Sequence, residues 1–524
     1  MPDTAAHRPY GSPIDASSGP RRSLILAGGG MRVAYQAGVV RALLEAGLTF
    51  AHADGTSGGV INLAMLLSGL SPEEMCERWR TLNARDFISF MPAEQYLKAL
   101  DMRAMGSADG VRDKVFPHLG IDVERIRAAD GMVGTFNVCN FTRKTLESIP
   151  NDAIELDLLI AGVSLPIFMP PVTHNDSLYA DAVWIKDANL MEAVRRGAEE
   201  LWVVWCIGNT GEYKNGMFDQ YVHMIELSAN GGLFEEFDRI AEINTRIAKG
   251  EPVYGHSQPI KLHLIKSEYP LPLDPDLYFG RISTATLIDM GYADASRYLA
   301  VAGSEGLPFQ PDVTGMQEDQ AGITFSETMT GGFALGATDP ADGDVQGKVA
   351  GTAMTMHCTI NVHDLARFVA DPDHTGGITG HISFPAFGED IPAQRGVFNL
   401  FQPTDQPQHT RMVYELAFRH EGRQYYLAGR KEVRHDPLID IWRDTTTLFT
   451  QLHEGPHKSG PVVGAGILHI QPNDLAKLIA ALHATHADSL GERAQAMLRF
   501  GRFFAGELWE TYARGRGGDE AMRR

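Results

Sequence analysis

The sequence predicts an α/β domain with a mainly parallel sheet flanked by helices, followed by an antiparallel β-barrel-like domain with C-terminal helices. Up to about residue 306, short apolar runs that end in glycine turns alternate with stretches of helical periodicity, which is typical of a mainly parallel sheet. Beyond that point, short period-two runs are separated by Gly, Pro and Asp turns, which indicates antiparallel strands. The 524 residues are enough for two such domains.

These patterns predict the elements in chain order. In the first domain we expect strands at 23–27, 48–53, 132–140, 158–161, 178–180, 201–207 and 260–264, and helices from Val33 onward, at 60–70 and at 283–299. In the second domain we expect strands at 355–362, 378–384, 397–401, 411–420, 424–433, 445–452 and 462–470, and amphipathic helices at 472–483 and 492–512. The expected domain limits are 23–306 and 320–512, with disordered tails at 1–22 and 513–524.

Composition argues against several classes of function. Lys and Arg number 46 against 66 Asp and Glu, and the net charge of −20 repels nucleic acid and anionic lipid unless a local patch overrides it. The four cysteines stand far apart without a C-x-x-C pair, so we expect buried thiols and no metal site. We expect no cofactor either.

We expect neither a secretory signal nor a membrane span. Residues 1–22 are polar and broken by prolines, which favours a cytoplasmic protein. Two windows without charged residues, 55–72 and 158–175, approach the length of a span. Glycine and polar residues interrupt the first and prolines interrupt the second, so both are assigned to buried core and loop.

The nucleophile pattern G-x-S-x-G is present as Gly55-Thr56-Ser57-Gly58-Gly59. In this pattern the serine stands on a sharp strand-to-helix turn, and small residues flank it because the strained backbone and the close helix leave no room for side chains. The apolar segments on both sides place Ser57 at a helix N-terminus, which favours a developing anion. The alternative is a glycine-rich turn with a capping serine.

A second glycine turn, at the end of the first predicted strand, contains Gly28, Gly29 and Gly30. Consecutive glycines let backbone N–H groups approach a ligand and point together, as an oxyanion hole requires. A dinucleotide site is the alternative, but Val33 replaces the third glycine of G-x-G-x-x-G.

A glycine-rich strand end with a basic residue, followed about 25 residues later by a serine elbow, resembles the patatin-like phospholipase family. The resemblance covers about residues 20–305 and is carried by residues 24–32, 55–59, 164–171, 179–183 and 291–292. It implies an α/β fold and a serine acyl hydrolase that cleaves lipid carboxylic esters.

The resemblance also implies which residues act. The family's Ser-Asp dyad falls on Ser57 and Asp181, and its oxyanion hole falls on Gly28, Gly29 and Gly30. A carboxylate with the ordinary pKa near 3.9 is a poor base at neutral pH. We therefore expect an apolar, water-poor site that makes the aspartate more basic.

Nearby residues offer alternatives for the base. Asp176 and Asp187 are rivals of Asp181, which we prefer because it directly follows a predicted strand, whereas Asp187 lies in a predicted turn. A Ser-His-Asp triad completed by His174 is a further alternative.

Two positions depart from the family pattern. Val33 and Ala182 stand where the family usually has glycine, and we expect a shifted pocket. Arg32 has three interpretations: it orients the glycine loop, meets a lipid phosphate, or forms a surface ion pair. The apolar residues at 165–169 also have three: an acyl-chain channel, a membrane contact, or core packing.

The C-terminal part weakly resembles a β-rich extension of some bacterial cholesterol-oxidase-like flavoproteins, at residues 325–329, 396–401 and 442–448. A barrel of about eight strands either holds an apolar ligand or is filled by side chains. We expect the last helix to pack on it through Phe500, Phe503, Phe504, Leu508 and Trp509.

The leading interpretation is a serine acyl hydrolase of lipid esters that forms an acyl-serine intermediate. The second is a catalytically weak lipid-binding or scaffolding protein, and the third is acyl transfer or thioester hydrolysis by the same dyad. Peripheral membrane contact and the oligomeric state stay open.

Overall fold

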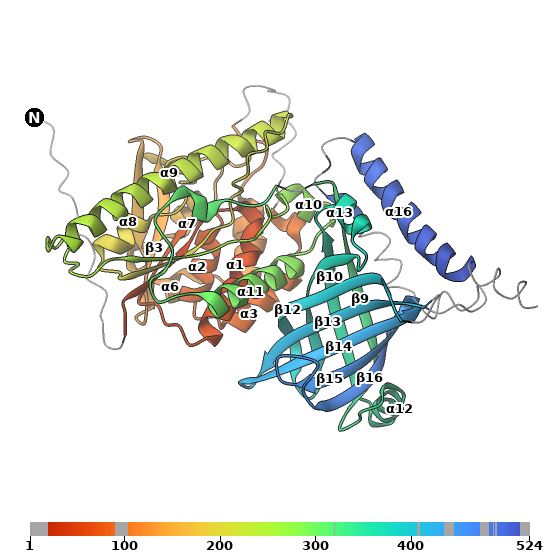
Figure 1. The fold of residues 1–524 in the computed structure, drawn as a ribbon. Coiled ribbons are helices and arrows are strands. Elements are labelled where there is room, and N and C mark those ends of the chain that lie inside the picture. Colours follow the sequence, from red (N-terminus) through yellow and green to blue (C-terminus); the bar gives the residue numbers. More distant parts are fainter. Residues whose placement is uncertain are drawn as a thin grey trace, which may run out of the picture. The chain divides into compact units, whose positions relative to one another are not determined.

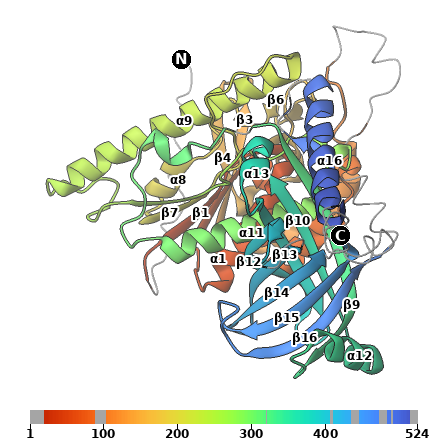
Figure 2. The same cartoon turned by 45° about the vertical axis from the view of Figure 1, so that its right-hand side comes forward.

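In the computed structural model, the chain divides into two compact units, residues 1–279 with 283–318 and residues 280–282 with 319–524. Figures 1 and 2 show them. The structure describes residues 19–87, 89, 103–318, 320–405, 409–433, 445–471, 482–485, 487 and 490–513, without the side chains of 490 and 507–513. Three of the sequence-based expectations fall outside these residues. They are nearly all of the two disordered tails, nearly all of the helix at 472–483, and the side-chain packing of Leu508 and Trp509.

The first unit contains an eight-stranded sheet in the order β5-β6-β3-β2-β1-β7-β8, with β4 also paired to β3. The strands β3, β2, β1, β7 and β8 run parallel, whereas β4, β5 and β6 make an antiparallel edge. Their bounds are β1 Arg22–Leu26, β2 His52–Thr56, β3 Val133–Asn140, β4 Thr145–Pro150, β5 Val172–His174, β6 Ser177–Ala180, β7 Glu200–Val204 and β8 Lys261–Ile265. The mainly parallel sheet is therefore confirmed.

Helices cover both faces of this sheet. On one face, α8 and α9 pack on β1 and β7 in a cluster that includes Ile25, Val203 and Phe237. On the other face, α11 places Tyr298 edge-on against the Trp202 ring. The helices are α1 Ala34–Glu45, α2 Gly59–Leu67, α3 Pro72–Thr81, α5 Phe116–His118, α6 Val123–Ala128, α7 Leu156–Gly162, α8 Leu190–Arg195, α9 Met217–Ala248, α10 Asp274–Tyr278 and α11 Thr284–Val301.

Two of the expected strands are corrected by the structure. The strand expected at 48–53 begins at His52 and runs to Thr56, because β2 carries buried polar residues that hide it from a search for apolar runs. The strand expected at 158–161 is wrong, since these residues lie in helix α7. A short apolar run does not distinguish a buried helix from a buried strand.

A closed antiparallel barrel of eight strands, β9 to β16, forms the second unit (Figure 2). The 14-residue strand β9 closes it by pairing with both β10 and β16, and the short β17 also pairs with β9. The strands are β9 Gly322–Leu335, β10 Ala353–Val362, β11 Thr375–Phe384, β12 Gly388–Pro403, β13 Thr410–His420, β14 Arg423–Val433, β15 Thr447–Glu454, β16 Val462–Ile470 and β17 His483–Thr485.

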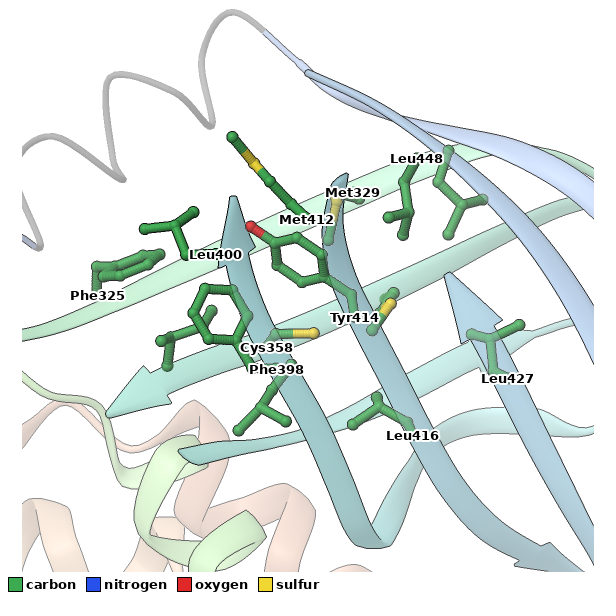
Figure 3. Close-up of a cluster of buried hydrophobic side chains, with 14 of the residues drawn as sticks. Phe325, Met329, Cys358, Phe398, Leu400, Met412, Tyr414, Leu416, Leu427 and Leu448 are labelled. Carbon is green, nitrogen blue, oxygen red and sulfur yellow. The ribbon is translucent and has the colours of Figure 1, made fainter. Parts of the chain in front are cut away.

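Side chains fill the barrel with an apolar cluster, which includes Met329, Phe398 and Tyr414 (Figure 3). One ion pair is buried with them: Lys431 Nζ lies 2.9 Å from Glu327 Oε2, and the Tyr414 hydroxyl donates to the other Glu327 oxygen at 3.1 Å. A buried ion pair needs such a hydrogen-bonded partner because water no longer solvates either charge. Of the two expectations for the barrel, the structure favours filling by side chains.

Three further helices belong to the second unit: α12 Pro340–Ala350, α13 Leu365–Ala370 and α16 Leu490–Ala513. The expected packing of the last helix on the barrel is confirmed for Phe500, Phe503 and Phe504: the Phe500 ring contacts that of Phe325 in β9, and the other two contact that of Phe401 in β12. Strand β9 and helix α12 were not expected, although Asp339 caps α12 by accepting the Ala341 N–H at 2.8 Å. Among the described residues, no helix is both long and apolar enough to cross a membrane.

Helices α1 and α11 cross at two glycines. A Cβ atom on Gly38 would lie 2.0 Å from the Ile288 carbonyl oxygen, and one on Gly291 would lie 2.0 Å from the Tyr35 carbonyl oxygen. The two backbones approach this closely only because both positions lack side chains. This contact keeps α1 in place behind the loop that follows β1.

We expect Gly291→Ala to lower the free energy of unfolding by about 1–3 kcal/mol, because the added methyl group forces α1 and α11 apart. The matched control is Gly231→Ala in α9, where a Cβ atom meets nothing within 4 Å. Alanine there should be neutral or stabilising, since it is the better helix former. Thermal unfolding followed by circular dichroism checks both, and equal midpoints for the two variants would contradict the prediction.

Candidate active site

Ser57 occupies the turn between β2 and α2, with a left-handed φ of 52°. A non-glycine residue rarely adopts this conformation, which turns the chain sharply from strand to helix. A Cβ atom on Gly59 would lie 2.0 Å from the Leu26 carbonyl oxygen, and one on Gly58 would lie 2.5 Å from the Gly30 carbonyl oxygen. The serine turn and the end of β1 therefore pack backbone against backbone.

Asp181 directly follows β6 and reaches the same edge of the sheet. Its side chain is hydrogen-bonded with Ser57, and its Oδ1 accepts the Val183 N–H at 2.9 Å. Ser57 is 7% exposed and Asp181 is 2% exposed. Burial outweighs these hydrogen bonds and raises the pKa of Asp181 to about 7, as the expected water-poor site requires.

Three polar side chains hold the glycine loop that follows β1. Asp187 accepts the Gly28 N–H at 3.1 Å, and Asp274 accepts the Met31 N–H at 3.1 Å. Arg32 Nε donates to the Gly29 carbonyl oxygen at 3.0 Å. With its two ends and its middle fixed, the loop keeps its backbone groups in one arrangement beside Ser57.

The N–H groups of Gly29 and Gly30 stand at the start of a 3-10 turn over Gly30–Val33, where helical geometry leaves the first N–H groups without partners. Gly29 has a φ of 154° and Gly30 a φ of 58°, which glycine adopts readily. Of the three glycines expected to form an oxyanion hole, Gly28 already donates its N–H to Asp187. The remaining two can donate to a ligand.

The structure distinguishes among the interpretations of Arg32. Its side chain is buried, so a surface ion pair is wrong. Its contact with Gly29 favours the role in orienting the loop. Burial raises the pKa of both Asp187 and Asp274, and the positive charge of Arg32 opposes this increase in each.

The rivals of Asp181 lie in different places. Asp176 is exposed in the β5–β6 hairpin, and His174 Nε2 is hydrogen-bonded to the Asn175 amide at 2.8 Å in the same hairpin. Asp187, in contrast, is fully buried beside the glycine loop. Burial raises its pKa to about 8, and the neighbouring Asp181 adds to this shift.

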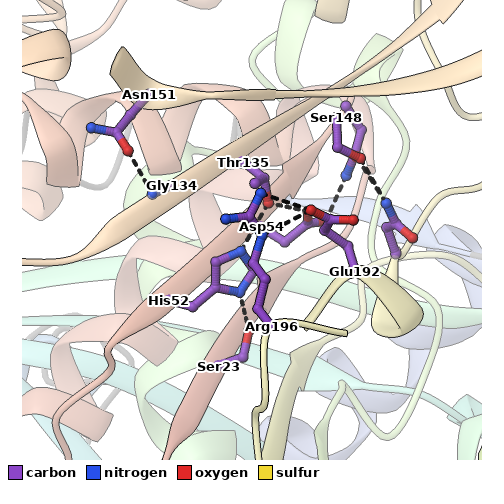
Figure 4. Close-up of polar contacts among 11 residues, drawn as sticks. Ser23, His52, Asp54, Gly134, Thr135, Ser148, Asn151, Glu192 and Arg196 are labelled. Carbon is purple, nitrogen blue, oxygen red and sulfur yellow. Dashed lines mark hydrogen bonds and ion pairs between the residues drawn. The ribbon is translucent and has the colours of Figure 1, made fainter. Parts of the chain in front are cut away.

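A buried polar chain supports β2 beneath the serine turn (Figure 4). Thr135 Oγ1 donates to Asp54 Oδ2 at 2.5 Å, His52 Nε2 lies 3.0 Å from Thr135 Oγ1, and Ser23 Oγ lies 2.7 Å from His52 Nδ1. Because the Thr135 hydroxyl proton points to Asp54, His52 donates from Nε2 and accepts from Ser23. Burial lowers the pKa of His52 to about 3, in agreement with a neutral ring.

This network continues to the segment that carries Asp187. Asn137 Nδ2 donates to Asp54 Oδ1 at 2.5 Å and to Thr56 Oγ1 at 2.9 Å. Asn189 Nδ2 donates to Asn137 Oδ1 at 3.1 Å and to Ser148 Oγ at 2.9 Å. Strands β2, β3 and β4 thereby fix the chain two residues beyond Asp187.

The Pro-rich segment beside Asp181 exposes Ile167, whereas the apolar residues around Ile167 are half-buried and the Phe168 ring packs edge-on against that of Tyr221. The expectation of core packing is therefore wrong for Ile167 only. The Asp181 N–H donates to the Ser164 carbonyl at 3.0 Å, and the Tyr221 hydroxyl of α9 donates to the Pro166 carbonyl at 2.8 Å. Ile167 is 55% exposed and has a φ of 78°, an outlier for a β-branched residue. The chain is strained there while it exposes an apolar side chain.

The two departures from the family pattern are both buried. Val33 packs against Gly58, where a Cβ atom would lie 2.7 Å from Val33 Cγ1, and Ala182 is fully buried next to Asp181. Neither residue separates Ser57 from Asp181, which remain hydrogen-bonded.

Asp274 was not expected at the site. It comes from α10, 243 residues after its partner Met31, and Leu273, Pro275 and Asp276 around it read as an ordinary helix start. No motif in the sequence around Asp274 indicates that it contacts the glycine loop. The expected buried thiols are confirmed, since all four cysteines are free and buried.

Residues 24–194 match a family model described as patatin-like phospholipase. The resemblance expected over about residues 20–305 is thus confirmed for this shorter range, and the match supports a lipid ester hydrolase. No curated protein matches the chain. Among solved structures, the crystal structure of VipD from Legionella pneumophila is similar, with 13% identity, a TM-score of 0.29, and coverage of 54% of this chain and 67% of that chain.

The raised pKa of Asp181 predicts a pH-dependent cost in stability. The pKa of Asp181 is about 7 in the folded protein, whereas an aspartate in an unfolded chain has a pKa near 3.9. The stability contributed by the protonated group is therefore fully present below about pH 4 and is lost as the pH rises to about 7. We expect Asp181→Asn to raise the unfolding temperature at pH 8 and to have a smaller effect at pH 5. Thermal unfolding at both pH values checks this, and an equal decrease at both would contradict it.

Proposed function

We propose that the protein is a serine acyl hydrolase that cleaves lipid carboxylic esters through Ser57 and Asp181. The observation that carries the proposal is the buried hydrogen bond between these two side chains, on a serine turn that packs against a glycine loop. With a pKa of about 7, Asp181 is ionised in part at neutral pH and is still basic enough to accept a proton. The patatin-like phospholipase match over residues 24–194 supports the substrate class.

The proposed reaction has two halves. Asp181 takes the Ser57 hydroxyl proton while Ser57 Oγ attacks the ester carbonyl carbon, and the resulting oxyanion accepts hydrogen bonds from the Gly29 and Gly30 N–H groups. The tetrahedral intermediate then breaks the ester C–O bond, and the proton on Asp181 passes to the leaving alcohol. Asp181 then takes a proton from water, which attacks the acyl-serine carbonyl carbon; the bond from that carbon to Ser57 Oγ breaks, the proton on Asp181 passes to Ser57 Oγ, and the carboxylic acid leaves.

A catalytically weak lipid-binding or scaffolding protein is less well supported. That interpretation requires Val33 and Ala182 to disrupt the dyad, whereas both are accommodated in buried positions with the Ser57 and Asp181 hydrogen bond intact. The site equally suits acyl transfer or thioester hydrolysis, because these reactions use the same nucleophile, base and oxyanion donors.

Hydrolysis of p-nitrophenyl esters of graded chain length tests the dyad. We expect Ser57→Ala to reduce kcat/KM by about a thousandfold or more, and Asp181→Asn by about a hundredfold or more, because each removes a group that acts in the transition state. Asp176→Asn, in the exposed hairpin, is the matched control and should retain the rate. An inactive intact protein, or a folded Asp181→Asn variant with full rate, would refute this assignment.

We also infer that the exposed apolar side chains beside the site contact the lipid surface. The Met105 N–H donates to the Ile167 carbonyl at 2.7 Å, and the two side chains, 54% and 55% exposed, stand next to the segment that is bonded to Asp181. The net charge of −20 favours a zwitterionic over an anionic surface. The strained backbone of Ile167 is of the kind that persists at functional sites.

For this contact we expect Ile167→Asp to reduce hydrolysis of a long-chain ester in phosphatidylcholine vesicles by about threefold or more, because a charged side chain does not enter the lipid. Hydrolysis of dissolved p-nitrophenyl butyrate should change little. The matched control is Val301→Asp at the C-terminal end of α11, where another exposed apolar residue lies near the start of β8 and not at the edge that bears Ser57. Equal losses on both substrates would contradict the lipid contact.

A further inference from the structure

Asp187 lies at the glycine loop, although the proposed mechanism gives it no role. Each of its carboxyl oxygens is 3.1 Å from the Gly28 nitrogen, and its side chain is fully buried. A Cβ atom built on Gly28 would lie 2.2 Å from Asp187 Oδ1 and 2.8 Å from the Ser57 Cβ. The carboxyl group and the nucleophile therefore converge above one glycine.

Neighbouring side chains fix Asp187 in this place. Lys186 Nζ lies 2.7 Å from Glu236 Oε1 of α9, and the other Glu236 oxygen accepts the Met191 N–H at 2.6 Å. Asn189 is held by its hydrogen bonds to β3 and β4. The residues before and after Asp187 are thus anchored to different elements, through contacts in which the Asp187 carboxyl group takes no part.

Charged and titratable groups face Asp187 from three directions. Asp181, six residues earlier in the chain, repels its negative charge, and Arg32 in the turn after β1 attracts it. Cys206, just beyond β7, is a neutral neighbour because burial raises its pKa to about 12. Burial is the largest influence on Asp187 itself, and with the repulsion from Asp181 it exceeds the attraction of Arg32 and of the Gly28 N–H.

We propose that Asp187 is a positioning residue that must be uncharged for hydrolysis: as a neutral acid it holds the Gly28 peptide, and as an anion it opposes the reaction. An ionised Asp187 would place a second negative charge beside Asp181 and beside the oxyanion that forms on the Ser57 adduct. In a water-poor site such repulsion is weakly screened and offsets what the Gly29 and Gly30 N–H groups contribute. This inference rests on the proposed function.

A bell-shaped pH profile follows from the two carboxyl groups. The rate should rise as Asp181 loses its proton, near pH 7, and fall as Asp187 loses its proton, near pH 8. Because the two groups interact, the two limbs report the pair and not each residue in isolation. The alkaline limb is the signature that a purely structural role of Asp187 does not produce.

The test is the pH dependence of kcat/KM for a dissolved p-nitrophenyl ester, with the Ser57→Ala rate subtracted as background. For the intact protein we expect a decrease of about tenfold or more between pH 7.5 and 9.5. In Asp187→Asn, whose amide stays neutral and still accepts the Gly28 N–H, the two rates should agree within about twofold. Asp187→Ala should be slower than Asp187→Asn at both pH values, because it also removes the acceptor for Gly28.

The exposed Asp176 provides the matched control, and Asp176→Asn should keep the alkaline decrease of the intact protein. Two results for Asp187→Asn would overturn the inference and leave the proposed function intact. Either the variant shows the same decrease in rate at alkaline pH as the intact protein, or it is folded and hydrolyses the ester at no pH. If the intact protein neither hydrolyses an ester nor reacts at Ser57 with a fluorophosphonate, the proposed function fails and this inference fails with it.

Discussion

The close approach of two backbones at the edge of the sheet is the constraint on which the rest of the site depends. Gly59 lies against the end of β1 and Gly58 against the glycine loop, with no space for a side chain at either position. Because β1 and β2 are adjacent and parallel, the turns that follow them meet at one edge. Ser57 and the glycine loop are thereby brought together by backbone packing, and Asp187, Arg32 and Asp274 hold the loop in this arrangement.

The same burial that organises the site also destabilises its charges. The pKa of Asp54, Asp181 and Asp187 is raised to about 7, 7 and 8, in each case chiefly by desolvation. Hydrogen bonds from Thr135, Asn137 and backbone N–H groups compensate for this only in part. A water-poor environment that makes a carboxylate basic therefore works against the folded state at neutral pH, which is a common relation between active sites and stability.

The sequence predicts those parts of the fold that short-range patterns encode. The serine turn, the strand before Asp181 and most barrel strands follow from glycine patterns and alternation, and the structure brings Ser57 and Asp181 together, although their chemical roles stay predictions. The limits of β2 were missed because its alternate side chains are polar and satisfied internally by Thr135 and Asn137. The contacts of Asp187 and Asp274 with the glycine loop join residues 159 and 243 positions apart, and no local pattern records such a contact.

The pairing of β9 constrains the order in which the second unit can form. This strand pairs with β10, which follows it closely, and also with β16, about 130 residues later in the chain. Until β16 has been synthesised, β9 and β15 each expose an unpaired edge on a sheet with an apolar inner face. The barrel can therefore close only late in synthesis, through a contact between distant parts of the chain. A chain that stops before residue 462 has two unpaired strand edges, which promote aggregation.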